Sequence, residues 1–367
     1  MLYGHGDNGY LHPRELLADF SSNVWHGGEP AGLKEHIFQR WGLVNKYPEV
    51  LAESLTASIS RYHELDPENI LINNGTTESI YLIAQLFQGR SSTIVFPSFA
   101  EYEDACRMHQ HSLQLVPWQE LEAYAERLAA GEQDRPEAPD DAEGPDNAPR
   151  PVWLNTDLLW IGNPNNPTGA VLPALGILVR LHPQIIFIID EAFIEFTHSI
   201  GSSIGLIREL PNLVILRSLT KAYAIPGLRL GYIAAAREIL VRLRAFKLPW
   251  SVNALALEAG SFIFDRLSTI RLPLISLLAD KADFSRRVQE TGIKVQTSHT
   301  HFFLCETAHG DAATLQHFLL NRHRLLIRNA SNFRGLGIKH FRLATLATDK
   351  NHLLVNALKE WKEQQYT

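Results

Sequence analysis

The chain has 367 residues, of which 45% are hydrophobic and 20% charged, so it is long enough for two or three structural units of a soluble globular protein. Its formal net charge of −6 and isoelectric point near 6.2 argue against nucleic acid and anionic membranes as partners, because both favour basic proteins. The two cysteines, Cys106 and Cys305, form no disulfide framework and no CxxC pair, which indicates a reducing cytoplasm.

Residues 1–40 are expected to form an irregular N-terminal arm that packs with a small domain. The segment carries HGDN at 5–8 and DFSSN at 19–23, and three glycines and a proline between 27 and 32 break any periodicity. Its first residues lack the basic and apolar regions of a signal peptide, so we expect none. No uninterrupted apolar run approaches the ~20 residues that a membrane helix needs.

Residues 41–250 are expected to form a large α/β domain in which buried strands alternate with helices. The strands are predicted at 69–72, 92–97, 158–162, 185–190 and 213–216. Their continuous apolar character suits a mostly parallel sheet that is buried on both faces. In such a sheet, ligands bind beyond the carboxyl ends of the strands. Residues 131–151 interrupt the pattern with five prolines and seven acids against two arginines, which predicts a flexible, solvated insertion.

Residues 251–367 are expected to form a smaller α+β domain. A helical pattern of apolar residues comes first, and strands are predicted near 294–298, 301–306, 325–331 and 340–346.

Polar motifs follow several of the predicted strands. Thr76 and Thr77 begin a helix, whose free N–H groups and dipole could bind an anion, although a simple N-capping threonine is the alternative. Asn166 lies in NPNNPTG at 163–169, where two prolines make a rigid turn that can direct an amide at a ligand or merely connect two elements.

The next two strands end in charged groups. Asp190 closes an apolar strand and needs a cationic partner, such as a protonated ring nitrogen, because burying an unpaired charge is costly. Ser218, Lys221 and Arg229 follow within twelve residues of one another. A desolvated lysine suits Schiff-base formation, and an arginine suits bidentate phosphate binding. A solvent-exposed lysine is the alternative for Lys221.

Together these motifs provide an anion cradle, an amide, a carboxylate for a pyridinium and an imine-forming lysine, which are the groups that pyridoxal 5'-phosphate needs. The order Asn166, Asp190, Lys221, Arg229, with spacings of 24, 31 and 8 residues, is far more specific than any one motif.

On these motifs the chain resembles the aspartate-aminotransferase-like (fold type I) family of pyridoxal-phosphate enzymes. Within it, the chain resembles the histidinol-phosphate aminotransferases and, more closely, the L-threonine O-3-phosphate decarboxylases of cobalamin biosynthesis. The resemblance covers nearly the whole chain outside 131–151. It is carried by HGDN, TTESI, FAEY, DEAFIEF, LRSLTKAYAIPGLRLGY, PWSVNALA and LIRNASN.

The resemblance implies a role for each of thirteen residues. Lys221 would form the internal aldimine and be released when substrate binds, and Asp190 would pair with the pyridine nitrogen. Further cofactor contacts are implied for Asn166 at the 3-oxygen, for Tyr102 stacked on the ring, and for Thr76, Thr77, Ser218, Arg229 and the partner subunit's Tyr47 at the phosphate. Substrate contacts are implied for Arg342, Arg328, His5 and Asn23. The implied protein is a homodimer with shared active sites and a small phosphorylated amino acid as substrate.

Two reactions are open to such a site. The cofactor labilises the Cα bond that stands perpendicular to its ring, so substrate anchoring decides between decarboxylation and transamination. Phe193 stands where many aminotransferases of this fold carry a tyrosine, which favours the decarboxylase. In contrast, Asp7 in HGDN and Leu346 after Arg342 depart from the decarboxylase pattern. A sensor domain that binds the cofactor without catalysis ranks low, since no basic helix-turn-helix precedes the chain's motifs.

No metal site is expected. His299 and His301, and likewise His109 and His111, lie two apart, but no third ligand is evident, and metal sites need three or four. The expectation is that these histidines are solvated.

Overall fold

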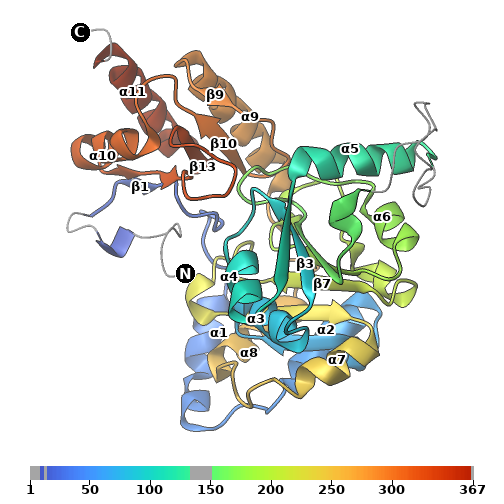
Figure 1. Ribbon diagram of the computed structural model, residues 1–367. Coiled ribbons are helices and arrows are strands. Elements are labelled where there is room, and N and C mark those ends of the chain that lie inside the picture. The colour runs from blue at the N-terminus through green and yellow to red at the C-terminus, as the bar shows by residue number, and fades with distance from the viewer. Residues whose placement is uncertain (1–8, 12–14, 133–150, 365–367) are drawn as a thin grey trace, which may run out of the picture.

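The computed structural model describes residues 9–11, 15–132 and 151–364 (Figure 1). The predicted flexible insertion at 131–151 therefore lies almost wholly outside the described residues, as does HGDN at 5–8. No helix among the described residues is long and apolar enough to cross a membrane.

A seven-stranded sheet forms the centre of the larger part of the molecule. Its strand order is β2-β8-β7-β6-β5-β3-β4. The strands are β2 (Ile70–Asn73), β3 (Ser91–Phe96), β4 (Ser112–Pro117), β5 (Leu158–Gly162), β6 (Ile186–Asp190), β7 (Leu213–Ser218) and β8 (Gly231–Ala235). Only β8 runs antiparallel to its neighbours, so the mostly parallel sheet predicted from the continuous apolar segments is confirmed. The sequence analysis missed β4 and β8.

Helices cover both faces of this sheet. One face is covered by α1 (Leu33–Gln39), α2 (Glu53–His63), α5 (Trp118–Ala129), α6 (Leu175–Leu181) and α8 (Ala254–Asp265), and the other by α3 (Gly75–Leu86), α4 (Glu101–Met108) and α7 (Arg237–Arg244). Successive strand residues serve opposite faces: Ile188 packs with the α3 side and Ile189 with the α2 side. This two-sided burial explains why the strands read as unbroken apolar runs.

A smaller unit is built on a four-stranded antiparallel sheet of order β12-β13-β10-β9. Its strands are β9 (Lys294–Val295), β10 (Phe302–Glu306), β12 (Arg328–Asn329) and β13 (His340–Ala344), with α9 (Leu274–Glu290), α10 (Ala312–His323) and α11 (Thr348–Gln364) packed on them. Only the first part of the predicted arm (1–40) joins this unit, because β1 (Ala18–Asp19) pairs in parallel with β11 (Leu325–Leu326), whereas α1 at its end packs with α8 on the large sheet. Figure 1 shows the arm in blue beside α10 and β13.

Short 3₁₀ turns complete the described chain. They span Gly9–Leu11, Trp41–Asn45, Pro67–Asn69, Val152–Leu154, Ile194–Phe196, Ser203–Arg208 and Pro226–Leu228.

The two units meet at an apolar junction. Phe193, which follows β6, packs edge-on against Phe302 of β10 with ring centroids 4.9 Å apart. Helix α8 packs against α2 and α1, so residues 254–265 lie with the large sheet, although the sequence analysis placed everything after 250 in the small domain. We propose that the smaller unit begins after α8; the division into an arm, a large domain and a small domain stays a proposal.

Candidate active site

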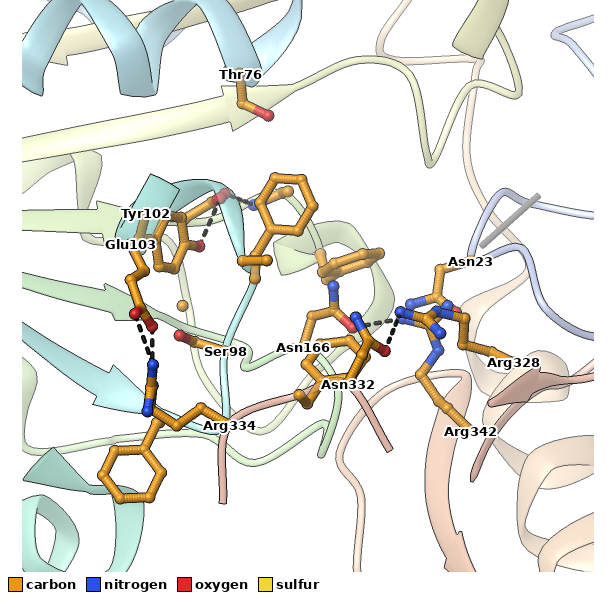
Figure 2. A pocket seen from close by; sticks show the side chains of 18 of the residues that line it. Asn23, Thr76, Ser98, Tyr102, Glu103, Asn166, Arg328, Asn332, Arg334 and Arg342 are labelled. Carbon is orange, nitrogen blue, oxygen red and sulfur yellow. Dashed lines mark hydrogen bonds and ion pairs between the residues drawn. The ribbon is translucent and has the colours of Figure 1, made fainter. Parts of the chain in front are cut away.

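A cavity of about 750 Å³ lies at the carboxyl ends of β5, β6 and β7, between the large sheet and the smaller unit. It brings together eleven of the thirteen residues to which the sequence analysis gave roles. They are Asn23, Thr76, Thr77, Tyr102, Asn166, Asp190, Ser218, Lys221, Arg229, Arg328 and Arg342. Parallel strands end at a common edge, which is why motifs far apart in the sequence converge here (Figure 2).

Asp190 and Lys221 form the charged centre of this cavity. Asp190 ends β6 and is buried; its Oδ2 accepts from the Tyr102 hydroxyl at 2.8 Å and its Oδ1 from the Ala192 N–H at 2.9 Å. Burial raises the pKa of Asp190, while these two hydrogen bonds and the positive charge of Lys221 oppose that rise. A further cationic donor, such as a protonated ring nitrogen, would therefore stabilise the ionised form of this carboxylate.

Tyr102 is held on two sides. Besides its bond to Asp190, its ring stacks on that of Trp160, with centroids 5.8 Å apart. The side chain lines the cavity from α4, and its expected stacking on a cofactor ring stays a prediction.

The first turn of α3 forms one wall of an anion cradle. Thr76 and Thr77 line the cavity where the N–H groups of a helix have no partner within the helix. The backbone there is too close to its surroundings for a side chain: a Cβ at Gly231 would stand 2.8 Å from the Arg217 carbonyl oxygen and 3.1 Å from the Thr76 nitrogen. A Cβ at Gly75 would stand 2.6 Å from Nη2 of Arg229. Glycine at these two positions therefore allows α3, β7 and β8 to pack this closely.

A hydroxyl pair completes the cradle. Ser218 ends β7 and lies 2.8 Å from the Thr220 hydroxyl, and both side chains are buried against the cavity. The sequence analysis missed Thr220. Its signal was available, since it directly precedes Lys221 on the same polar turn.

Two arginines from the smaller unit form the opposite wall. Arg342 donates to the Asn166 side-chain oxygen and, at 2.7 Å, to the Ser21 carbonyl oxygen. Asn166 thus has its oxygen engaged and only its amide N–H groups left to donate to a ligand. Burial lowers the pKa of Arg342 to about 9 and that of Arg328 to about 10, and the charge of Arg328 adds to the effect on Arg342. A bound anion would stabilise the charged form of both guanidiniums.

Asn23 contributes a buried amide to the same wall (Figure 2). The side chain is only 4% exposed, and neither its nitrogen nor its oxygen has a hydrogen-bond partner among the described residues. A buried polar group without a partner costs free energy, so this amide indicates a site that a ligand completes.

Two of the thirteen residues are not in the cavity. Tyr47 is 83% exposed, and its ring lies 5.0 Å from that of Trp250, away from the pocket of its own chain. Its predicted role at the partner subunit's phosphate stays a prediction. His5 lies outside the described residues.

The cavity also contains polar residues that the sequence analysis missed. They include Ser21, Ser98, Glu103, Asn332 and Arg334. Ser98 directly follows the strand predicted at 92–97, and Asn332 and Arg334 belong to the NFRGLG stretch, whose two glycines mark a loop, so these three had a signal in the sequence.

The histidine expectation is partly wrong. His301 is fully buried and stacks on Phe196 with centroids 3.8 Å apart, and burial lowers its pKa to about 3. His111 is also buried, between the Ser92 hydroxyl and the Ala84 carbonyl. Within the described part of the chain, no group of three or more His, Cys, Asp or Glu residues could hold a metal ion.

A family model described as aminotransferase class I and II matches residues 19–358. The chain belongs to this family. Because this family and the solved structures that superpose on the chain have fold type I, the fold class inferred from the motifs is confirmed.

Relatives of known name refine the comparison within the aminotransferase class I and II family. The chain is 32% identical to the threonine-phosphate decarboxylase of Salmonella typhimurium, covering 95% of this chain and 92% of that protein. It is 30% identical to a histidinol-phosphate aminotransferase of Caldanaerobacter subterraneus, covering 86% and 84%. The crystal structure of the L-threonine-O-3-phosphate decarboxylase from Porphyromonas gingivalis superposes with a TM-score of 0.83 at 35% identity, covering 95% and 100%. The resemblance drawn from the motifs is confirmed.

Membership of this family indicates pyridoxal 5'-phosphate as the cofactor. The residues present fit it: a glycine-lined anion cradle under Thr76, a buried carboxylate at Asp190 and a lysine on the next strand end. The chain is therefore a pyridoxal-phosphate-dependent enzyme of the aminotransferase class I and II family.

Proposed function

We propose that the chain decarboxylates L-threonine O-3-phosphate. The Cα–carboxylate bond breaks, carbon dioxide leaves, and a proton is added at Cα to give (R)-1-aminopropan-2-yl phosphate. The observation that carries the proposal is the pair of buried arginines, Arg328 and Arg342, on the wall across the cavity from the cofactor cradle. Two adjacent cations with lowered pKa values suit a substrate that carries both a carboxylate and a phosphate.

The chain's own residues would hold the cofactor as follows. Asp190 would face the ring nitrogen, the amide N–H of Asn166 would donate to the 3-oxygen, and the ring of Tyr102 would lie against the cofactor ring. The phosphate would rest among Thr76, Thr77, Ser218 and Arg229. Lys221 would supply the amine that holds the cofactor.

Substrate anchoring would select the reaction. The bound cofactor withdraws electrons from whichever Cα bond stands perpendicular to its ring. Arg342 and Arg328, with the amide of Asn23, would fix the two anionic groups so that the carboxylate takes that position. Lys221, which lines the cavity, would deliver the proton at Cα.

Transamination of histidinol phosphate is the second candidate. It is favoured by the 30% identity to a histidinol-phosphate aminotransferase, and its substrate also carries a phosphate. Phe193 argues against it, because this buried ring offers no hydroxyl at the cavity where many aminotransferases of the fold carry a tyrosine.

We further propose a homodimer in the cytoplasm, with active sites shared between subunits. Support comes from two pairs of exposed aromatic side chains: the rings of Phe38 and Trp41 stack with centroids 6.2 Å apart, and those of Tyr47 and Trp250 lie 5.0 Å apart. Phe38 is 63% and Trp41 53% exposed. Large exposed apolar side chains that gather in this way are typical of protein interfaces.

The reaction is tested by incubating the purified holoenzyme with L-threonine O-3-phosphate and measuring released carbon dioxide. A parallel assay supplies histidinol phosphate and 2-oxoglutarate and measures glutamate. Carbon dioxide release that is lost in Lys221→Ala supports the decarboxylase. Glutamate formation without carbon dioxide would replace it with the aminotransferase.

The shared site is tested by coexpressing two inactive variants, Lys221→Ala and Tyr47→Ala. In a mixed dimer, one of the two sites combines Lys221 from one chain with Tyr47 from the other. Isolated mixed dimers should therefore regain about half of the wild-type activity, and a randomly paired mixture, half of which is mixed dimer, about a quarter. No recovery in isolated mixed dimers would exclude the sharing of Tyr47.

A further inference from the structure

One loop of the smaller unit, residues 331–337, reaches across the cavity to the large sheet. It connects β12 to β13, and Ser331 to Leu336 all line the cavity. Gly335 sits directly on the ring of Phe96 at the end of β3, where a Cβ would stand 2.7 Å from two ring carbons. The backbone of this loop therefore touches the other unit over the mouth of the site.

A bidentate ion pair fastens the same loop. Arg334 donates to the carboxylate of Glu103, on α4, through Nε at 2.9 Å and Nη2 at 2.6 Å (Figure 2). Hydrogen bonding from Arg334 is also the main cause of the lowered pKa of Glu103. The contact joins residues 231 positions apart, one from each unit.

The loop in turn holds a substrate-wall arginine. Arg328 donates to Oδ1 of Asn332 at 2.8 Å, and its guanidinium lies 5.1 Å from the ring centroid of Phe333. Asn332 and Phe333 immediately precede Arg334. The position of the Arg328 guanidinium is thus linked, through three consecutive residues, to the ion pair on the opposite wall.

We propose that Glu103 and Arg334 act as a positioning pair that holds the 331–337 loop across the cavity. The held loop in turn positions the Arg328 guanidinium to bind the substrate's second anionic group. The pair would act on the substrate through the loop and Arg328. It determines how well a doubly anionic substrate is held, and so contributes to specificity for such substrates over those with a carboxylate alone. The inference about substrate rests on the proposed function; the inference about the loop does not.

The geometry distinguishes this role from ordinary surface pairing. Arg107 also contacts Glu103, through Nε at 2.9 Å, but it lies one turn further along α4 and outside the cavity. Removing Arg107 takes a cation from the same carboxylate without releasing the loop. Arg107→Ala is therefore the matched control for Arg334→Ala.

The loop itself is tested by hydrogen exchange of the holoenzyme, followed by mass spectrometry. Arg334→Ala and Glu103→Gln should each speed exchange in the peptide that covers 331–337, whereas Arg107→Ala should leave it as in the wild type. Because this measurement does not depend on turnover, its result remains valid even if L-threonine O-3-phosphate is not the substrate. Unchanged exchange in Arg334→Ala, or equal acceleration in Arg107→Ala, would overturn the fastening role.

The link to substrate is tested by steady-state kinetics with L-threonine O-3-phosphate. Arg334→Ala and Glu103→Gln should raise KM by up to about fivefold, the effect of losing one partly exposed ion pair, with kcat within about twofold. The charge-swapped double variant, Glu103→Arg with Arg334→Glu, should bring KM part of the way back to the wild-type value. A merely structural defect would not be reversed in this way. A fall in kcat with unchanged KM, or a swap worse than both single variants, would contradict the role.

A second variant approaches the loop without altering charge. Gly335→Ala places a methyl group against Phe96 at a positive φ of 79°, so it should lift the loop and raise KM in the same direction. If Gly335→Ala speeds exchange in 331–337 but leaves KM unchanged, the loop does not position Arg328.

Discussion

Arg328 and Arg342 stand directly opposite each other on the neighbouring antiparallel strands β12 and β13. Both side chains are buried, at 7% and 5% exposure, and both reach the cavity. Burial out of water lowers the pKa of Arg328 to about 10 and that of Arg342 to about 9, and the charge of Arg328 lowers the pKa of Arg342 further. The site is thus electrostatically incomplete until an anion occupies it.

Inorganic phosphate should therefore stabilise the holoenzyme. We expect 20 mM phosphate at pH 7.5 to raise the melting temperature by a few degrees relative to chloride at equal ionic strength, since a ligand that binds only the folded state stabilises it by mass action. The shift should be largely lost in Arg342→Met. Because Arg342 deprotonates near pH 9 when no anion is bound, the shift should decline as the pH rises through 9. A shift that persists unchanged at pH 10, or in Arg342→Met, would place the anion elsewhere.

Asp190→Asn should weaken cofactor binding and catalysis together. The variant keeps the shape of the side chain but removes the negative charge that would face a protonated ring nitrogen in this buried position. Loss of such a buried charge partner costs about 2–5 kcal/mol, so we expect at least about a 30-fold rise in the cofactor dissociation constant. Equilibrium dialysis measures it.

Tyr102→Phe is the matched control for that substitution. It removes only the hydroxyl that donates to Asp190 and leaves the charge in place, so the dissociation constant should rise by about tenfold or less. An effect of Tyr102→Phe as large as that of Asp190→Asn would mean that the carboxylate acts through the tyrosine rather than on the cofactor.

The cofactor side of the cavity was predictable from sequence, and the substrate side only in part. Asn166, Asp190 and Lys221 follow apolar strands, and parallel strands necessarily present their carboxyl ends together. By contrast, the contact between Glu103 and Arg334 depends on how the smaller unit lies over the large sheet, which no local pattern encodes. The strand β8 was missed for a similar reason: GYIAA is short, and only its pairing between β2 and β7 defines it.

The burial of His301 could not be predicted from sequence either. With no third metal ligand evident in the sequence, solvent was the expectation for this histidine. In the fold, the ring packs against Phe196, which comes from the segment after β6, and its Nε2 lies 3.2 Å from the Asn23 carbonyl oxygen. Both partners are supplied by segments remote in the sequence.

Phe193→Tyr should change the titration of the bound cofactor. Phe193 lines the cavity beside Asp190 and is 6% exposed. A tyrosine hydroxyl able to donate to the cofactor's 3-oxygen would stabilise that oxygen's negative charge and so weaken its hold on the proton of the neighbouring Lys221 nitrogen. The apparent pKa of the cofactor's absorbance band should therefore fall by about one unit. Spectrophotometric titration from pH 5 to 9 measures it, and a rise in that pKa would contradict the argument.

The buried ion cluster beneath the site gives a prediction about stability. Arg217, which immediately precedes Ser218, donates to Glu195 and, at 3.2 Å, to the Ser202 hydroxyl, and its Nη1 lies 3.7 Å from Glu191. Arg217→Met would leave the two glutamates without their cation. Breaking a buried pair in this way costs about 3–5 kcal/mol, measured as the free energy of unfolding in urea.

The control for this substitution is Arg180→Ala, which removes an arginine from the exposed pair with Glu209 and should cost about 0–1 kcal/mol. If Arg217→Met does not fold, Arg217→Lys keeps the prediction testable, because it retains the charge but not the planar guanidinium that contacts both Glu195 and Ser202. It should lose less than Arg217→Met and more than Arg180→Ala. Glu191 is next to Asp190 in the chain, and Arg217 is next to Ser218, so a change in the cluster should shift two residues proposed to bind the cofactor. Arg217→Lys should therefore also weaken cofactor binding, whereas Arg180→Ala should not. Equal unfolding free energies for Arg217→Lys and Arg180→Ala would show that the cluster contributes no more than a surface pair.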